Sequence, residues 1–110
     1  MNEASAEQRL LSLMGFAKKA GKIRSGELMA EKTIKSGKAR LVVIDSGISE
    51  QSRKRWSDIC RSAGVPIIEA NGLGRAIGKE AHMVACIADN GFANSIMQTY
   101  KILDPNFGGN

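Results

Sequence analysis

The chain has 110 residues, the length of one ordinary domain. Hydrophobic residues make up 43% and charged residues 25%, enough to build a core, so the composition excludes a wholly disordered chain. Sixteen Lys and Arg against eleven Asp and Glu leave a formal charge of +5, which favours an acidic partner, most often nucleic acid.

The N-terminus has no basic region of the kind that begins a secretory signal, and no apolar run approaches the roughly 20 residues that a membrane helix needs. We therefore expect a cytoplasmic protein without membrane contact. Cys60, Cys86 and the single His82 form no close-spaced set. We expect no metal and no cofactor, and interpret the cysteines as reduced core residues.

Basic residues are concentrated in one segment. Residues 18–40 contain eight of the sixteen Lys and Arg but only two of the eleven acids. The eight are Lys18, Lys19, Lys22, Arg24, Lys32, Lys35, Lys38 and Arg40. Two interpretations stay open, a solvated basic face and a surface that contacts phosphates.

The first elements in chain order are a helix, a short strand and a second helix. Apolar residues at helical spacing predict the first helix, which Ser5 and Gln8 begin as a capping box and Gly21 ends. Residues 22–24 predict a short strand or an extended link. Ser25 is expected to cap the second helix, which ends near Gly37 and contains a favourable pair of Glu31 with Lys35.

Strands and helices alternate through the rest of the chain. Residues 39–45, 65–69 and 82–88 predict strands. Helices are predicted from Ser49 to Gly64, over 71–78, and from Asp89 or Asn90 to Leu103. This alternation predicts an α/β sandwich with helices on both faces of the sheet. Residues 1–103 then form a single domain, and residues 104–110 a flexible tail.

The sequence gives little support for catalysis or nucleotide binding. Gly72, Gly74 and Gly78 approach a dinucleotide fingerprint, but the third glycine comes one position late. The only histidine has no partner at a spacing that suggests a catalytic set. Asp45, at the end of a predicted central strand, is expected to bond the turn that follows. We therefore predict that the protein is not an enzyme.

The start of the second helix is a candidate phosphate site. Ser25, Gly26 and Glu27 lead into the first turn, where a helix presents unpaired N–H groups and the positive end of its dipole. Arg24 and Lys32 flank this turn in the sequence. On local features alone, contact with nucleic acid and a plain capped helix remain alternatives.

Several blocks in the chain resemble a known family. They are GELMAEKTIKSGKARLVVI (residues 26–44), GVPI (64–67) and LGRAIGK (73–79). In order and spacing they are similar to the L-seven-Ae/L-thirty-e ribosomal protein family. FAKKAGK (16–22) and GFA (91–93) are most similar to its short bacterial members, of the YlxQ type. The resemblance covers roughly residues 8–97.

This resemblance implies a three-layer α-β-α sandwich with a four-stranded mixed sheet. It also implies binding of structured RNA, commonly kink-turns, by the helix over residues 26–37 and the loop before the last strand. The expected partner is ribosomal or regulatory RNA, with association with the ribosome possible, and the protein is expected to be a monomer. The residues expected at the RNA are Lys22, Arg24, Ser25, Gly26, Glu27, Leu28, Met29, Lys32, Gly78, Lys79, Glu80, Ala81 and His82.

The chain departs from the family pattern at two positions. Members that read kink-turns begin this helix with Gly-Thr-Asn-Glu and place a Lys three residues later. Gly26 and Lys32 match, but Leu28 and Met29 stand where the Asn and Glu would be. Neither side chain can form polar contacts with base edges. The alternative is therefore an adaptor that keeps the fold and binds a protein through Leu28 and Met29.

Overall fold

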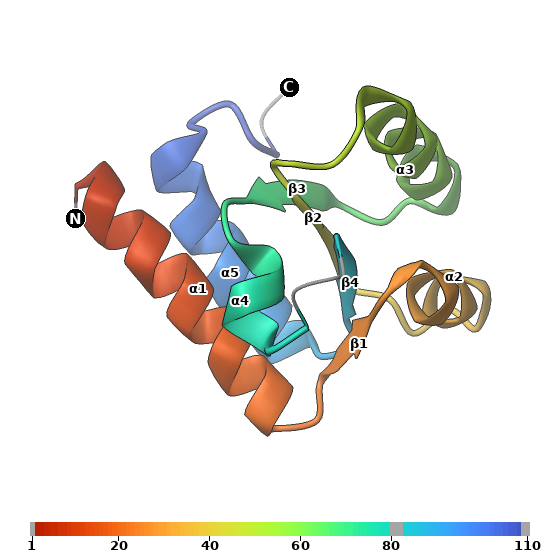
Figure 1. Ribbon diagram of the computed structural model, residues 1–110, viewed down its shortest axis with the longest axis horizontal. Coiled ribbons are helices and arrows are strands. Elements are labelled where there is room, and N and C mark those ends of the chain that lie inside the picture. The colour runs from red at the N-terminus through yellow and green to blue at the C-terminus, as the bar shows by residue number, and fades with distance from the viewer. Residues whose placement is uncertain (1, 80–82, 109–110) are drawn as a thin grey trace.

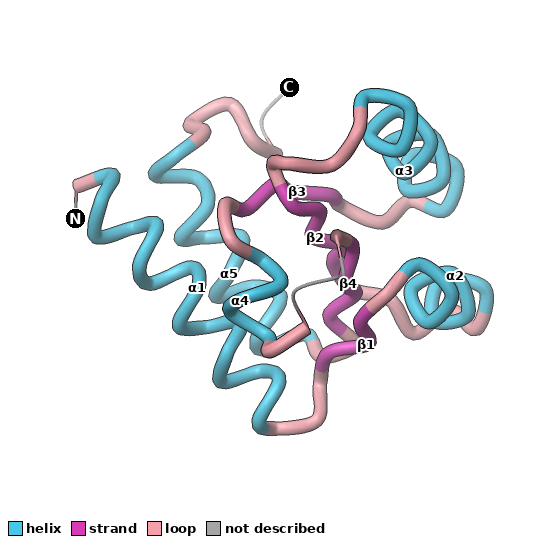
Figure 2. Tube along the Cα trace, viewed as in Figure 1, coloured by secondary structure: helices cyan, strands magenta, loops and turns pink. Residues whose placement is uncertain are grey.

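A four-stranded sheet lies between two layers of helices in the computed structural model, which describes residues 2–79 and 83–108 (Figure 1). The strands are β1 (Ile23–Ser25), β2 (Leu41–Asp45), β3 (Ile67–Ala70) and β4 (Val84–Ile87). The helices are α1 (Glu3–Lys19), α2 (Glu27–Lys35), α3 (Glu50–Ala63), α4 (Leu73–Ile77) and α5 (Asn90–Leu103). Figure 2 shows short loops joining most of these elements.

The helices divide between the two faces of the sheet. α1, α4 and α5 cover one face, and α2 and α3 cover the other (Figure 1). Side chains from β2 and β4 alternate between the two resulting cores, so both strands are buried throughout their apolar length. This arrangement confirms the predicted three-layer α-β-α sandwich.

The sheet is mixed, with the strand order β1-β4-β2-β3. β4 is antiparallel to both of its neighbours, β1 and β2, whereas β2 and β3 are parallel. The four-stranded mixed sheet is therefore confirmed. Because β1 and β2 both oppose β4, they run in the same direction, and their last residues, Ser25 and Asp45, lie at the same end of the sheet.

The two cysteines belong to the core on the α2 and α3 side. Cys60 on α3 and Cys86 on β4 are both buried and free, which confirms their interpretation as core residues. Burial raises the pKa of each thiol to about 11. Neither thiol is therefore a ready nucleophile at neutral pH.

Some predicted helix caps are correct and two are wrong. Ser49 caps α3 and Asp89 caps α5, as predicted. α1, however, begins at Glu3, and the amide of Ser5 donates to Oδ1 of Asn2 at 2.8 Å, so Asn2 is the cap. Ser25 does not cap α2 because it is paired with Ala85 in the sheet, and Gly26 takes the cap position.

A surface pair predicted within α2 is replaced by contacts with α3. Glu31 forms an ion pair with Arg55 of α3 and not with Lys35.

At the other end of the chain, the rings of Tyr100 and Phe107 meet edge to face with centroids 5.2 Å apart. Phe107 also packs against the core beside α1 and α5. The flexible tail over residues 104–110 stays a prediction.

Candidate nucleic-acid interface

The turn between β1 and α2 is built around Gly26. Its φ of 91° lies in the region that favours glycine. The Gly26 amide donates to the carbonyl of Val84 at 2.8 Å, so the start of α2 is tied to the start of β4. The first residue of β4 therefore lies beside the beginning of α2.

The first turn of α2 has free backbone donors. In the other helices an amide of the first turn donates to a side-chain oxygen, from Asn2 in α1, Ser49 in α3, Asp45 in α4 and Asp89 in α5. α2 has no such side-chain cap. Within the described residues the amides of Glu27, Leu28 and Met29 have no hydrogen-bond acceptor. Three donors thus remain available where the helix dipole is positive.

The carboxylate of Glu27 is turned away from these amides. Its Oε1 accepts a hydrogen bond from Nε1 of the fully buried Trp56 at 2.9 Å and lies 3.4 Å from Nη1 of Arg55. Glu27 therefore satisfies a buried donor of α3 and is partly neutralised by Arg55. Its charge opposes an incoming anion less than a free carboxylate would.

A groove of about 640 Å³ opens at this end of the sheet. Five predicted site residues line it, namely Ser25, Gly26, Glu27, Leu28 and Met29. Its other side is formed by Ile48, Ser49, Ser52 and Met83, which the sequence analysis did not identify. Ile48 and Ser49 follow β2. Because β1 and β2 run in the same direction, the residues that follow the two strands lie at the same end of the sheet, and this topological rule could have identified Ile48 and Ser49.

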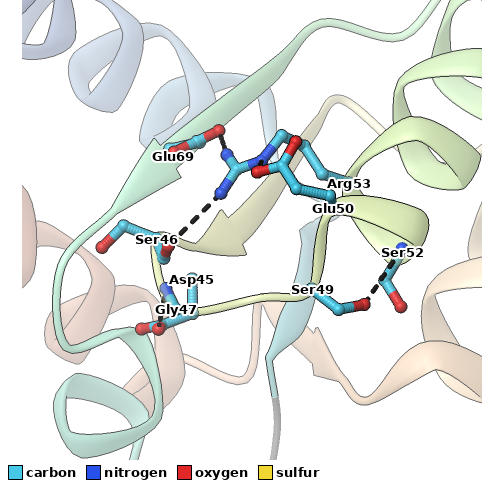
Figure 3. A network of polar contacts seen from close by, with 8 residues as sticks. All are labelled: Asp45, Ser46, Gly47, Ser49, Glu50, Ser52, Arg53 and Glu69. Carbon is cyan, nitrogen blue, oxygen red and sulfur yellow. Dashed lines mark hydrogen bonds and ion pairs between the residues drawn. The ribbon is translucent and has the colours of Figure 1, made fainter.

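Polar contacts hold the turn after β2 that forms one wall of this groove (Figure 3). The Asp45 carboxylate accepts from the amide of Gly47 at 2.8 Å and from that of Leu73 at 2.9 Å. Asp45 therefore bonds the following turn, as predicted. Arg53 of α3 donates to the carbonyl of Ser46 at 3.3 Å and pairs with Glu69 of β3. This wall is thus tied to α3, α4 and β3.

The solvent side of α2 is apolar at its start and basic further on. Leu28 is 67% exposed and Met29 is 41% exposed. Lys32 is exposed and lies one turn later on the same side, four residues from Leu28 and three from Met29. An incoming ligand would therefore meet two apolar side chains beside the uncapped amides, and an ammonium group further along the helix.

The remaining predicted site residues do not all reach this groove. Lys22 and Arg24 lie toward the opposite end of β1, and the Arg24 guanidinium points back to the carbonyl of Gly21. Gly78 caps the end of α4, and Lys79 follows it and is exposed. Glu80, Ala81 and His82 lie outside the described residues.

Two other kinds of site are absent from the described residues. Residues 2–79 and 83–108 contain no group of three or more His, Cys, Asp or Glu side chains placed to hold a metal ion. None of the described helices is both long and apolar enough to cross a membrane.

Comparisons with known proteins identify relatives of this chain. The chain is 39% identical to the RNA-binding protein YlxQ of Bacillus subtilis (strain 168) over 88 residues, covering 77% of this chain and 88% of the relative. It is 33% identical to the RNA-binding protein YlxQ of Enterococcus faecium, covering 84% of this chain and 91% of the relative.

Solved structures share the fold. A protein of unknown function from Bacillus halodurans C matches with a TM-score of 0.76 and 32% identity, over 82% of this chain and 94% of that one. The Giardia lamblia 15.5kD RNA binding protein matches with a TM-score of 0.71 and 25% identity, over 94% and 91%. The family model matches residues 8–97, and the chain therefore belongs to the ribosomal protein L7Ae/L30e/S12e/Gadd45 family.

Proposed function

We propose that this protein is a non-catalytic, cytoplasmic RNA-binding protein that holds structured ribosomal or regulatory RNA at the start of α2. The observation that carries the proposal is the uncapped first turn of α2, which opens onto the groove beside β4. Membership of the family and relatives named as RNA-binding proteins support it.

Phosphates are the natural ligands of the first turn. The amides of Glu27, Leu28 and Met29 can donate to phosphate oxygens, and the helix dipole favours the negative charge. Lys32 adds an ammonium group on the same side of α2. The sequence analysis suggests Lys79, which follows α4, as the best candidate for a second phosphate contact.

Leu28 and Met29 give this site an apolar part. Their exposed side chains can pack on a base or a sugar face, but they cannot hydrogen-bond to base edges. We therefore expect phosphates to supply most of the affinity. Sequence discrimination at this site should be correspondingly weak.

Lys32→Ala tests the proposal, with Lys54→Ala on α3 as the matched control. Neither lysine lines the groove, but Lys32 lies on α2 one turn after Leu28 and Met29, which do, whereas Lys54 is an exposed lysine of α3. Loss of one charge-assisted contact should weaken RNA binding by about 1–3 kcal/mol. Folding stability should be nearly unchanged, because exposed charges contribute little.

The measurement is a titration of a kink-turn RNA against both variants and the unmodified protein at one fixed salt concentration. The Lys54→Ala variant should bind like the unmodified protein. Equal affinity of all three proteins would place the RNA surface away from the start of α2.

A protein-binding adaptor is the second candidate, and the exposure of Leu28 and Met29 favours it. The two candidates differ in their dependence on salt. A complex dominated by phosphates weakens steeply as salt rises, whereas an apolar protein interface does not. Binding to RNA that is insensitive to salt, or absent, would favour the adaptor.

A further inference from the structure

The same four-residue pattern occurs at two junctions between a helix and a strand. Each consists of a glycine, a lysine, a buried apolar residue and an arginine. The two copies are Gly21-Lys22-Ile23-Arg24, between α1 and β1, and Gly37-Lys38-Ala39-Arg40, between α2 and β2. The glycines have φ values of 73° and 75°, so both chains turn in the same way after the helix.

The two arginines are held by the backbone in the same manner. Nη1 of Arg24 donates to the carbonyl of Gly21 at 2.8 Å and to that of Ile23 at 3.2 Å. Nη1 of Arg40 donates to the equivalent carbonyls, of Gly37 at 3.0 Å and of Ala39 at 3.4 Å. Each guanidinium is thereby fixed by the turn that precedes it.

The topology brings the two copies to the same end of the sheet. β1 and β2 lie on either side of β4, so their backbones are about 10 Å apart, twice the usual strand spacing. The carbonyl of Lys22 accepts from the amide of Ala88, and the amide of Arg40 donates to the carbonyl of Ile87. Both junctions therefore meet the end of β4, at the opposite end of the sheet from the groove.

Both arginine side chains also lie on the same face. Arg24, Cys86 and Val42 stand opposite one another on neighbouring strands, and residues paired in this way point to the same face of the sheet. Arg40 precedes Val42 by two residues, and residues two apart along a strand share a face. Burial is the main cause that raises the pKa of the Cys86 thiol to about 11, and the charges of Arg24 and Arg40 oppose it. Two guanidinium groups thus lie near one buried, uncharged thiol.

These cations are available to a ligand. A guanidinium has five N–H donors, and Nη1 supplies only two of them, so the Nε and Nη2 donors of Arg24 and Arg40 remain. Within the described residues those donors have no acceptor, and the ion pairs use Arg53, Arg55 and Arg61 instead. Lys22 and Lys38 are exposed beside them.

We propose that Arg24 and Arg40 form a second RNA-binding surface, which contacts phosphates of an RNA segment at the end of the sheet opposite the groove. Two pre-oriented guanidinium forks with adjacent lysines match the geometry of phosphate groups. This inference depends on the proposed function only for its ligand, RNA, and not for the site at α2.

The arginine pair suits RNA better than a protein or a membrane. The apolar members of the two copies, Ile23 and Ala39, are buried, so neither copy offers a hydrophobic anchor of the kind that protein interfaces and membrane insertion use. Asp89, which follows the end of β4, has its carboxylate engaged as the cap of α5. The two four-residue copies therefore present cations to solvent and bury their apolar members.

The test uses the double variant Arg24→Gln/Arg40→Gln and a plain RNA duplex of about 20 base pairs. The matched control is Arg9→Gln/Lys54→Gln, which removes two exposed cations that form no ion pair within the described residues. The arginine variant should bind the duplex about tenfold or more weakly, and the slope of log affinity against log salt should fall by about one per lost contact. The control should change both quantities little.

A second variant and a second measurement separate binding from folding. Arg24→Lys/Arg40→Lys keeps both charges but loses the forks, and its affinity should fall between those of the other proteins. In the unmodified protein, NMR amide signals of Gly21, Lys22, Gly37 and Lys38 should shift as the duplex is added. Unchanged signals there would overturn the inference.

The outcomes for the two sites are distinguishable. If Lys32→Ala weakens binding and the arginine variant does not, the site at α2 stands and the second surface is wrong. If only the arginine variant weakens binding, the second surface stands and the site at α2 is wrong. An equal loss in the arginine variant and its control would reflect bulk charge and would overturn the inference. If the arginine variant kept its RNA affinity but lost binding to polyglutamate, an acidic polypeptide, the ligand would be a protein and the inference would also be overturned.

Discussion

Introducing the polar residues of the family pattern should raise the affinity of this protein for kink-turn RNA, which we expect to be weak in the unmodified protein. The change is Leu28→Asn together with Met29→Glu, at the start of α2. Leu28 lies largely in solvent, Met29 is partly exposed, and both side chains line the groove. The substituted groups would therefore face a bound RNA without displacing core residues.

The structure limits the effect of these changes on folding. Leu28 is 67% and Met29 is 41% exposed, so little apolar contact is lost, and surface substitutions of this kind usually change stability by about 0.5 kcal/mol or less. A glutamate in the first turn is also favoured by the helix dipole, by about 0.3–1 kcal/mol. We expect the free energy of unfolding of the variant to stay close to that of the unmodified protein.

The effect on binding should be larger. A good bidentate contact to a base is worth about 1–3 kcal/mol of discrimination, taken from DNA recognition. Each 1.4 kcal/mol is a factor of ten, so kink-turn affinity should rise by about fivefold to 150-fold. Affinity for a control duplex of equal length and charge should change less, because it lacks the G·A edges.

The assay titrates both proteins against both RNAs at one fixed salt concentration. The comparison is the ratio of the two affinities for each protein. If the unmodified protein already prefers the kink-turn by about a hundredfold, or 2.7 kcal/mol, recognition does not require the Asn and Glu. That result, or no gain in the variant, would refute the reasoning.

Two further predictions concern stability. Glu27→Ala removes the acceptor of the buried Trp56 Nε1 and should lower the free energy of unfolding by about 1–3 kcal/mol in a urea titration. The control Glu31→Ala removes a surface partner of Arg55 and should lower it by less than about 1 kcal/mol, so equal losses would contradict this account. Because burial raises the thiol pKa of Cys60 and Cys86 from 9.0 to about 11, their contribution to stability is complete below pH 9 and should be lost as the pH rises toward 11. The double variant Cys60→Ala/Cys86→Ala should lose less stability over that interval, and identical pH profiles would show that the thiols are not responsible.

Local patterns predicted most of the fold. The runs of apolar residues in β2 and β4, the Ser49 cap and the left-handed Gly64 at the end of α3 depend on neighbours in the sequence. Features that depend on distant residues were missed. Glu31 pairs with Arg55, which is 24 residues away, and only the packing of α2 against α3 brings them together.

The candidate site shows the same division. Ser25 to Met29 are consecutive and were predicted together, and they line the groove together. Ile48, Ser52 and Met83 come from three other segments, and only the directions of β1, β2 and β4 bring them to the same end of the sheet. A local motif can therefore predict one wall of such a site, and the topology is needed for the other.

The basic segment over residues 18–40 divides for a topological reason. β1 carries the chain toward the groove, and α2, nine residues or about 13 Å long, carries it back. Lys22, Arg24, Lys38 and Arg40 consequently lie at the two junctions at the far end of the sheet, and Lys32 lies between the ends. The concentration of charge in the sequence is thus not one patch beside the groove. The salt dependence of RNA binding should accordingly respond to Arg24 and Arg40 independently of Lys32, because each arginine is held by the carbonyls of its own turn and none of these contacts involves Lys32.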